Sequence, residues 1–152
     1  MSRLIRFLRG LLAACVLLGA PQIAAAAKPE TYTGLIGDVA VGGYDVVSFF
    51  QGAPVKGADA NKATYKGAVY LFATPENAGK FKSNPAAYAP QYGGYCAWAT
   101  AQGKTAPGNP KFWRLVNGKL YLNYDAGVQK KWEKDIPGFI AKADANWPGI
   151  LK

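Results

Sequence analysis

Residues 88–99 read Tyr-Ala-Pro-Gln-Tyr-Gly-Gly-Tyr-Cys-Ala-Trp-Ala and gather four aromatic rings, a Gly-Gly pair and one thiol in a short stretch. Gly93 and Gly94 permit positive φ angles, so the pair predicts a bend that sets the direction of Cys96. The same residues also fit the start of a strand, in which Cys96 and Trp98 share one face and Cys96 is a small buried hydrophobe. A buried thiol and a thiol at a working site are both open at this point.

The first 27 residues have the pattern of a secretory signal peptide. Three arginines precede an apolar run at residues 10–19, and Ala24-Ala-Ala-Ala27 offers small residues for a cleavage site. This run is shorter than the roughly 20 apolar residues of a membrane-spanning helix, and no later stretch reaches that length. We therefore expect a periplasmic protein that is exported through this peptide and has no transmembrane segment.

A competing cleavage site lies inside this leader. Leu12-Ala-Ala-Cys15 has the letters of a bacterial lipoprotein box, which would leave a lipid anchor on Cys15. However, only residues 10–14 separate Arg9 from Cys15, fewer than the roughly 7–15 residues of an apolar signal core. We therefore favour cleavage after Ala27 over lipidation.

The charge of the chain argues against nucleic acid as a partner. The leader contributes three arginines and no acid, so its removal lowers the formal charge by three, from +9 to +6. Every remaining basic residue is a lysine except Arg114. Scattered lysines typify a solvated surface, whereas sequence-specific nucleic-acid binding relies on arginine forks. An anionic membrane face or an acidic partner is a weaker alternative.

The inventory of donor atoms excludes most familiar catalytic and metal sites. The chain has no histidine, and its single methionine is Met1. Zinc and copper sites draw on His, Cys and Met, and Ser-His-Asp or Cys-His catalysis needs an imidazole. After removal of the leader, Cys96 has no partner for an internal disulfide. We predict no cofactor.

Alternating apolar residues predict two β-hairpins. Residues 63–72 turn at Gly67, and residues 112–123 turn at Asn117-Gly118, which is among the strongest short turn signals. Residues 44–50 are rich in β-branched and aromatic residues, which favours a buried strand or a tight turn. Asp45 lies inside this run, where it either caps a turn or holds a hydroxyl or amide group. Residues 35–41 form an edge strand or an arm.

Helix signals follow each hairpin. Thr74 can cap a helix that has Pro75 in its first turn and continues to Ser83. Asp125 can cap a second helix that runs to Trp132. A third helix opens at Pro137, and its apolar stripe is formed by Ile136, Phe139, Ile140 and Ala143.

The succession of these signals resembles the YHS domain, in the form found in exported bacterial proteins. The resemblance is carried by Tyr44-Asp-Val-Val-Ser-Phe49, Tyr70-Leu-Phe-Ala-Thr-Pro-Glu-Asn77, Lys80-Phe81, Asn84-Pro85 and Tyr88. It covers residues 41–99 and implies a small α+β unit with a β-hairpin packed on a helix, in the manner of treble-clef metal domains. Such units often accompany metal-handling proteins, including copper-transporting ATPases.

The chain departs from the metal-binding members of this family. Where the resemblance places thiol ligands, this sequence has Ser48, Ala73 and Asn77, and the histidine that gives the family its name is absent as well. The resemblance therefore implies the fold of the family without its metal.

These inferences define an α+β protein with a single domain. Residues 1–27 are the signal peptide, residues 28–40 an N-terminal arm and residues 41–99 the YHS-like domain. Residues 100–152 add the second hairpin and the C-terminal helices to the same globule.

We predict an exported, non-catalytic binding or accessory domain whose partner is an unknown small molecule or protein. The candidate ligand-binding residues are Tyr44, Asp45, Tyr92, Tyr95, Cys96 and Trp98. One alternative is a metal-handling protein that uses Cys96 with oxygen ligands such as Asp45, although a single thiolate gives modest affinity. Another is a thiol-dependent enzyme or redox protein, which requires an electropositive setting around Cys96. A purely structural or interaction module is the remaining alternative.

Overall fold

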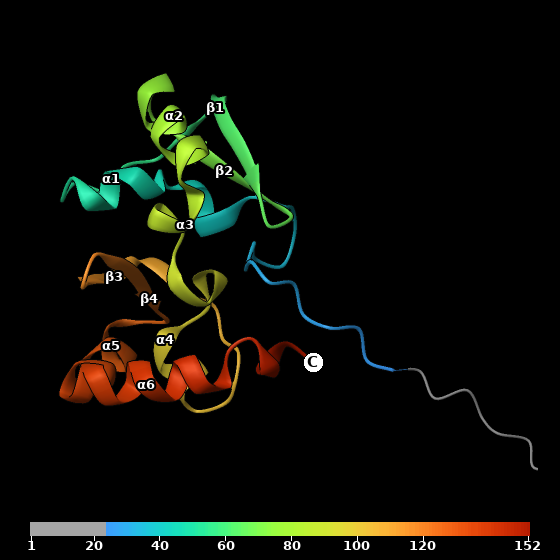
Figure 1. The fold of residues 1–152 in the computed structure, drawn as a ribbon, viewed down its shortest axis with the longest axis vertical. Coiled ribbons are helices and arrows are strands. Elements are labelled where there is room, and N and C mark those ends of the chain that lie inside the picture. Colours follow the sequence, from blue (N-terminus) through green and yellow to red (C-terminus); the bar gives the residue numbers. More distant parts are fainter. Residues whose placement is uncertain (1–23) are drawn as a thin grey trace, which may run out of the picture.

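A computed structural model describes residues 24–152, so the core of the predicted signal peptide and Cys15 lie outside the described residues. The elements are η1 (Ala40–Gly43), α1 (Val46–Phe50), β1 (Ala58–Tyr65), β2 (Ala68–Phe72), α2 (Pro75–Ser83), α3 (Pro85–Tyr88), η2 (Gln91–Gly94), α4 (Ala97–Ala101), β3 (Asn109–Val116), β4 (Lys119–Asn123), α5 (Ala126–Trp132), η3 (Glu133–Asp135), α6 (Ile136–Asn146) and η4 (Gly149–Leu151), where η denotes a 3₁₀ turn. Short helices and two separate antiparallel hairpins confirm the predicted α+β class (Figure 1).

The first hairpin, β1–β2, forms as the sequence predicts. Lys66 and Gly67 both have positive φ angles, the geometry of the tight turns that join antiparallel strands. Helix α2 then starts at Pro75, with the Thr74 hydroxyl accepting the Asn77 N–H at 3.1 Å. Its Phe81 ring lies on the sheet, 4.7 Å from the ring centre of Tyr70.

Within residues 44–50, Val46–Phe50 form helix α1 rather than the strand considered from the sequence. Asp45 is the N-cap of α1, and its carboxylate accepts the N–H groups of Val47 and Ser48. A cap of this kind stabilises the first helical turn, which outweighs the preference of the Val-Val pair for a strand. Of the two roles considered for Asp45, the structure shows both, because its carboxylate also holds the Asn77 amide.

The central stretch also ends in a helix. Gly93 and Gly94 have positive φ angles, which confirms the predicted bend. The strand considered for residues 95–99 is wrong, because α4 begins at Ala97 and only single bridges involve Tyr95 and Cys96. The Asn123 side chain accepts the Trp98 N–H at 3.2 Å and so stabilises the start of this helix.

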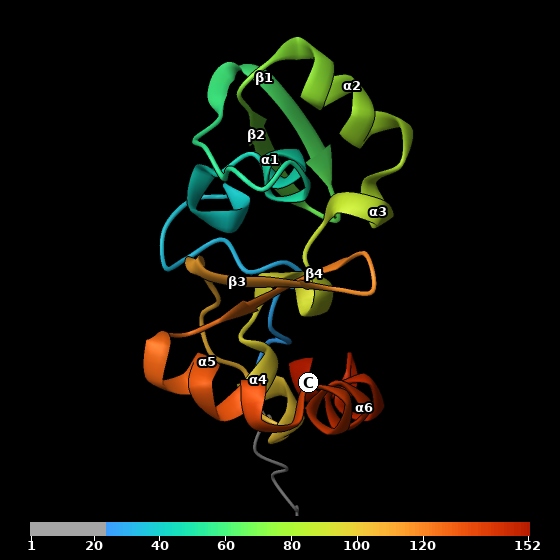
Figure 2. The same ribbon diagram turned by 90° about the vertical axis from the view of Figure 1, so that its left-hand side faces the viewer.

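The second hairpin lies in the middle of the molecule (Figure 2). From β4, Leu120 and Leu122 join the core that includes α1, β2 and α2. Between them, Tyr121 joins the core beneath α4, α5 and α6. Because successive side chains of β4 point to opposite faces, this one strand contributes to both apolar cores. The apolar stripe predicted for the last helix lies in the second core, on α6, and consists of Ile136, Phe139, Ile140 and Ala143.

Residues 24–39 form an arm that runs over both halves of the molecule (Figure 1). The Tyr32 N–H donates to the Gly93 carbonyl at 2.9 Å, and the Val69 N–H donates to the Asp38 carbonyl at 2.7 Å. The edge strand considered for residues 35–41 is reduced to one bridge between Val39 and Val69.

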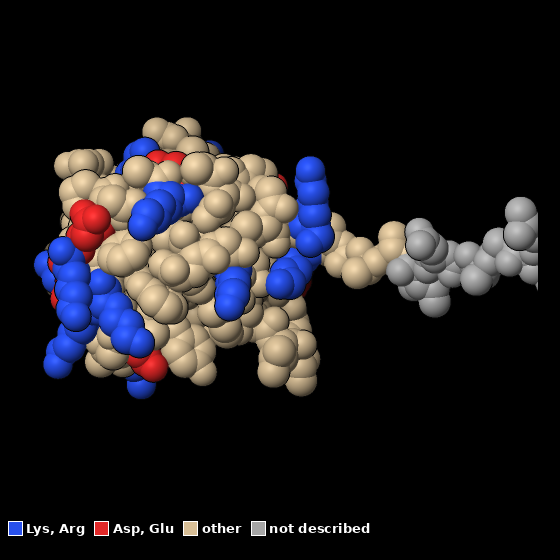
Figure 3. All heavy atoms as spheres, turned by 90° about the horizontal axis from the view of Figure 1, so that it is seen from below, with Lys and Arg blue, Asp and Glu red and all other residues tan. Residues whose placement is uncertain are grey.

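Charged side chains are distributed unevenly on the face of the molecule shown in Figure 3. On the face in Figure 3, several basic side chains gather at one edge beside acidic ones, and the other basic side chains stand apart. Within residues 24–152, no helix combines the length and the hydropathy needed to cross a bilayer.

We name two units by their residues: the first unit is 40–88 and the second unit is 91–146. Each contains a 3₁₀ turn, a short helix, a hairpin and further helices in that order. In Figure 2 the first unit occupies the upper part of the molecule and the second the lower part.

Candidate functional site

The structure separates the six predicted site residues. Tyr44 and Asp45 belong to the first unit, whereas Tyr92, Tyr95, Cys96 and Trp98 belong to the second. Two cavities are described below, and among these six residues only Tyr92 lines either of them. Asp45 and Cys96 have separate sets of polar partners, so they do not form the common ring-lined pocket that the sequence predicts.

Asp45 is fully buried, and both of its carboxylate oxygens accept hydrogen bonds. Oδ1 accepts the N–H groups of Val47 at 2.9 Å and Ser48 at 3.3 Å. Oδ2 accepts the Ala73 N–H at 2.9 Å and the Asn77 Nδ2 at 2.7 Å. This carboxylate is thus a structural acceptor at the junction of α1, β2 and α2.

The three positions at which the family resemblance implies thiol ligands meet around this carboxylate. Ser48, Ala73 and Asn77 each contribute one donor to the Asp45 carboxylate. Ala73 has no side-chain donor atom for a metal, and the oxygens of Asp45 already accept these hydrogen bonds. The residues present therefore do not fit a soft metal ion, which prefers thiolates. Among residues 24–152, no three His, Cys, Asp or Glu side chains are grouped to hold a metal.

Cys96 is fully buried at the N-cap of α4. Its thiol faces the Asn123 Oδ1 at 3.7 Å, and its backbone N–H donates to the Ala106 carbonyl. Burial raises the pKa of the Cys96 thiol, which disfavours the reactive thiolate.

The aromatic members of the predicted site have structural contacts. The Tyr92 hydroxyl donates to Asp144 Oδ1 at 2.8 Å, and the Tyr95 hydroxyl donates to the Pro29 carbonyl at 2.9 Å. Burial, together with the Asp144 carboxylate, raises the pKa of Tyr92. Cations cover the other two rings, with Lys56 Nζ 4.4 Å from the ring centre of Tyr44 and Lys131 Nζ 5.4 Å from that of Trp98.

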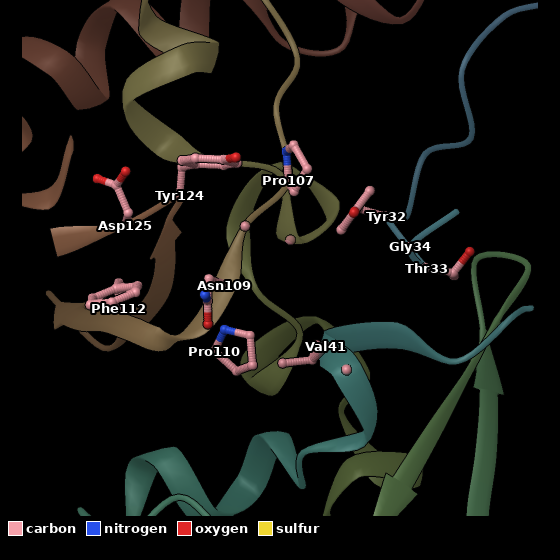
Figure 4. Close-up of a pocket in the computed structure, with 13 residues that line it drawn as sticks. Tyr32, Thr33, Gly34, Val41, Pro107, Asn109, Pro110, Phe112, Tyr124 and Asp125 are labelled. Atoms are coloured by element: carbon pink, nitrogen blue, oxygen red, sulfur yellow. The ribbon is translucent and has the colours of Figure 1, made fainter. Parts of the chain in front are cut away.

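The larger cavity, of about 530 Å³, lies where the arm and the two units meet (Figure 4). We call it the interunit cavity. Its side-chain walls are mainly aromatic rings and prolines: Tyr32, Val41, Pro107, Pro110, Phe112 and Tyr124. Figure 4 shows Tyr124 extending toward Pro107, with Tyr32 on the opposite side.

The polar side chains at this cavity already bond to the backbone. Asn109 Oδ1 accepts the Lys111 N–H at 2.9 Å, and Asp125 Oδ1 accepts the Val128 N–H at 2.8 Å as the cap of α5. The hydroxyls of Tyr32 and Tyr124 make no hydrogen bond to other residues of the described chain. The cavity therefore presents apolar rings, two phenol groups, and the Asp125 Oδ2 and Asn109 Nδ2 atoms to a ligand.

Sequence reasoning missed this cavity. The sequence of residues 101–110 has no periodic pattern, and Tyr124 follows the second hairpin as one more aromatic residue. The signal that exists is the proline pair in Pro107-Gly-Asn-Pro110, because each proline ring fixes its own φ angle. The contribution of Tyr32 depends on where the arm lies, which the sequence does not specify.

A second cavity, of about 400 Å³, has a more polar wall. It includes Tyr70, Tyr92 and Asp144. Of its four charged side chains, Asp144 accepts the hydrogen bond from Tyr92, Lys66 and Glu30 form an ion pair with each other, and Lys119 is the fourth. We therefore regard the interunit cavity as the better candidate site.

Comparison with known proteins identifies one family. The model of the YHS domain matches residues 46–92, from the start of α1 into η2. No curated protein and no solved structure matches the chain.

Proposed function

We propose that this chain, which contains a YHS domain over residues 46–92, is an exported, non-catalytic binding protein whose ligand occupies the interunit cavity. The observation that carries the proposal is the cavity itself, about 530 Å³ in volume and walled by rings. Ligand sites in proteins typically have volumes of about 300–1,000 Å³ and mostly apolar walls.

The exposure of its aromatic residues supports this assignment. Tyr124 is 51% exposed, although a large ring normally contributes most when it is buried. Phe112 belongs to neither apolar core. Because neither residue is used in the packing of a core, a role in binding accounts for their presence at the cavity.

The state of the reactive groups supports a non-catalytic role. A general acid or base must reach the substrate, and a cysteine nucleophile must ionise. Asp45 is enclosed by its four donors, and Cys96 is buried with a raised pKa. Binding therefore fits the chemistry of the described residues better than thiol-dependent catalysis does.

The start of the arm supports export with cleavage after Ala27. The Lys28 N–H donates to the Leu151 carbonyl at 2.7 Å, and its Nζ donates to the Thr105 hydroxyl at 2.5 Å. Residues 24–27 are exposed and have no regular structure. Attachment to the globule thus begins at the first residue of the predicted mature chain. Mass spectrometry of the protein from a periplasmic fraction tests this, since a chain acylated at Cys15 would refute cleavage after Ala27.

Titration with 2-naphthol, followed by two-dimensional NMR of the backbone amides, tests ligand binding. We expect shifts confined to the amides that line the cavity, including those of Gly94 and Gly108. Tyr124→Ala should weaken binding at least about tenfold if the loss of its ring costs about 1.4 kcal/mol. Val55→Ala, at an exposed apolar side chain outside the cavity, is the matched control and should leave the affinity unchanged. Shifts elsewhere, or none at millimolar 2-naphthol, would contradict the proposal.

A further inference from the structure

Each of the six elements of the first unit has a counterpart in the second unit, which adds only the short turn η3 between α5 and α6. In the first unit, η1, α1, β1, β2, α2 and α3 start at residues 40, 46, 58, 68, 75 and 85. In the second, η2, α4, β3, β4, α5 and α6 start at 91, 97, 109, 119, 126 and 136, so each start differs from its counterpart by 51. The 3₁₀ turns, the short helices and all four strands also have equal lengths in the two units.

The backbone repeats its rarest conformations at the same interval. Val41 and Gly42 have φ angles of 54° and 57°, and their counterparts Tyr92 and Gly93 have 56° and 59°. The turn residues Lys66 and Asn117 have φ angles of 48° and 50°. Positive φ is uncommon outside glycine and is an outlier for a β-branched residue such as valine. Independent folding of two unrelated segments would not reproduce this pattern.

Hydrogen bonds and strand irregularities match as well. The Asp45 N–H donates to the Val55 carbonyl at 2.9 Å, and its counterpart Cys96 donates to Ala106 at 2.9 Å. Both hairpins shift register at the same place, between residues 58 and 62 and between residues 109 and 113.

Identical residues stand at several corresponding positions of the two units. They include Gly-Gly-Tyr at 42–44 and 93–95, Gln-Gly at 51–52 and 102–103, and Tyr-Leu at 70–71 and 121–122. The pair Gly57 and Gly108 is also shared. A Cβ at Gly57 would lie 2.3 Å from the Leu71 carbonyl carbon, and one at Gly108 would lie 2.0 Å from the Gly94 oxygen, so neither position tolerates a side chain.

We infer that residues 91–139 are a tandem copy of the YHS-type unit at residues 40–88, and that their divergence created a binding face for a planar aromatic small molecule. The family match reaches only residue 92, so this second unit lies almost entirely beyond it. The ligand class that we infer rests on the proposed function of the interunit cavity. The inference of a tandem copy is independent of that function, because it rests on the repeated backbone geometry.

The first divergence explains the position of Cys96. It is the counterpart of Asp45, the N-cap whose carboxylate accepts the Val47 N–H. In the second unit, the counterpart of that donor is the Trp98 N–H, which donates to Asn123 Oδ1 instead. The acceptor has thus moved from the cap residue to β4, which accounts for a buried asparagine where the first unit has Phe72.

The second divergence concerns the face of the cavity. Phe112 and Tyr124 replace Asn61 and Ala73, so two rings stand where the first unit has an amide and a methyl group. Pro107 replaces Lys56, whose Nζ in the first unit donates to the Gly42 carbonyl at 2.5 Å.

These exchanges determine the class of ligand. The rings and prolines offer flat apolar surface, and the Asp125 and Asn109 side chains already accept backbone N–H groups. A planar aromatic ring with a hydroxyl group stacks on such walls and can bond to a phenol of Tyr32 or Tyr124.

A stability experiment tests the copy without any ligand. Restoring the residues of the first unit with Cys96→Asp/Asn123→Phe/Val128→Asn frees the Trp98 N–H from Asn123 and places a carboxylate and its amide partner at the positions of Asp45 and Asn77. If the N–H donors around position 96 are arranged as they are around Asp45, this variant should have a higher melting temperature than Cys96→Val, within about 5 °C of the wild type. If the site is an ordinary apolar core position, the buried carboxylate unfolds the protein or places its melting temperature at or below that of Cys96→Val, which overturns the inference.

A binding experiment tests the divergent face. Phe112→Asn/Tyr124→Ala, the residues of the first unit, should weaken 2-naphthol binding more than tenfold, and decahydro-2-naphthol, which is not planar, should bind at least tenfold more weakly than 2-naphthol. Lys111→Ala likewise introduces the first-unit residue, Ala60, at an exposed position outside the cavity wall and should bind as the wild type does. Failure of the wild type to bind 2-naphthol refutes the proposed function. Equal binding by the wild type and Phe112→Asn/Tyr124→Ala, or equal binding of the two probes, refutes this inference instead.

Discussion

Removal of the Asp45 carboxylate should cost a large part of the stability of the protein. Asp45→Ala removes the helix cap of α1, a loss of about 0.5–2 kcal/mol. It also leaves the Ala73 N–H and the Asn77 amide without their acceptor, each worth about 1–3 kcal/mol when buried. With incomplete additivity, we expect a decrease of about 3–5 kcal/mol in the free energy of unfolding, measured by urea denaturation with tryptophan fluorescence.

Two further variants separate the parts of this effect. Asp45→Asn keeps one acceptor oxygen and turns its amide nitrogen toward donors, so it should cost roughly half as much as Asp45→Ala. Asp125→Ala is the matched control, because Asp125 is also an N-cap but is exposed, and within residues 24–152 its carboxylate accepts only the Val128 N–H; it should cost about 1 kcal/mol. Equal losses for Asp45→Ala and Asp125→Ala would refute the reasoning, since Asp45 would then act as a simple cap.

Three other predictions follow from burial and backbone geometry. Burial raises the pKa of Tyr70 to about 12 from 10.0, so the folded protein holds this proton more tightly than the unfolded chain does. The free energy of unfolding should therefore fall between pH 10 and 12. In urea titrations of Tyr70→Phe this fall with pH should be shallower, and an unchanged fall would exclude Tyr70 as its source. Cys96 should not react with a disulfide reagent at pH 7.5 until urea unfolds the chain, and rapid reaction of the native protein would contradict its burial. Gly108→Ala should destabilise strongly because its Cβ would lie 2.0 Å from the Gly94 oxygen, whereas Gly79→Ala, in open space on α2, should raise the free energy of unfolding by about 0.5–1 kcal/mol; similar denaturation midpoints for the two variants would refute the close approach.

The local chemistry of turns and caps could be predicted from the sequence. The turn at Asn117-Gly118 and the cap at Thr74 depend on neighbouring residues alone, and both form as expected. Residues 44–50 and 95–99 were harder, because their residues favour a strand while a distant or embedded acceptor stabilises a helix. For α4 that acceptor is Asn123, which lies on the second hairpin and cannot be assigned to Trp98 from the sequence.

The candidate site was less predictable than the fold. In the sequence, an acid within an apolar run and a thiol beside glycines both indicate a binding site, so both are predicted to line one pocket. In the structure each belongs to its own unit: Asp45 caps α1, whereas Cys96 stands at the start of α4, where Asn123 accepts the Trp98 N–H. The repeat at an interval of 51 residues explains this separation, since Asp45 and Cys96 occupy corresponding places in the two units.

The same correspondence explains how this fold holds together where the resemblance implies a metal in relatives. A metal joins the strand, the hairpin and the helix by binding side chains from each of them. Here the Asp45 carboxylate joins α1, the end of β2 and α2 through donors at those three places. A backbone N–H serves as a donor at any residue, so Ala73 contributes although its side chain has no polar atom. One acid can therefore replace a set of thiols while the surrounding residues diverge, which leaves other faces of the molecule free to acquire a cavity.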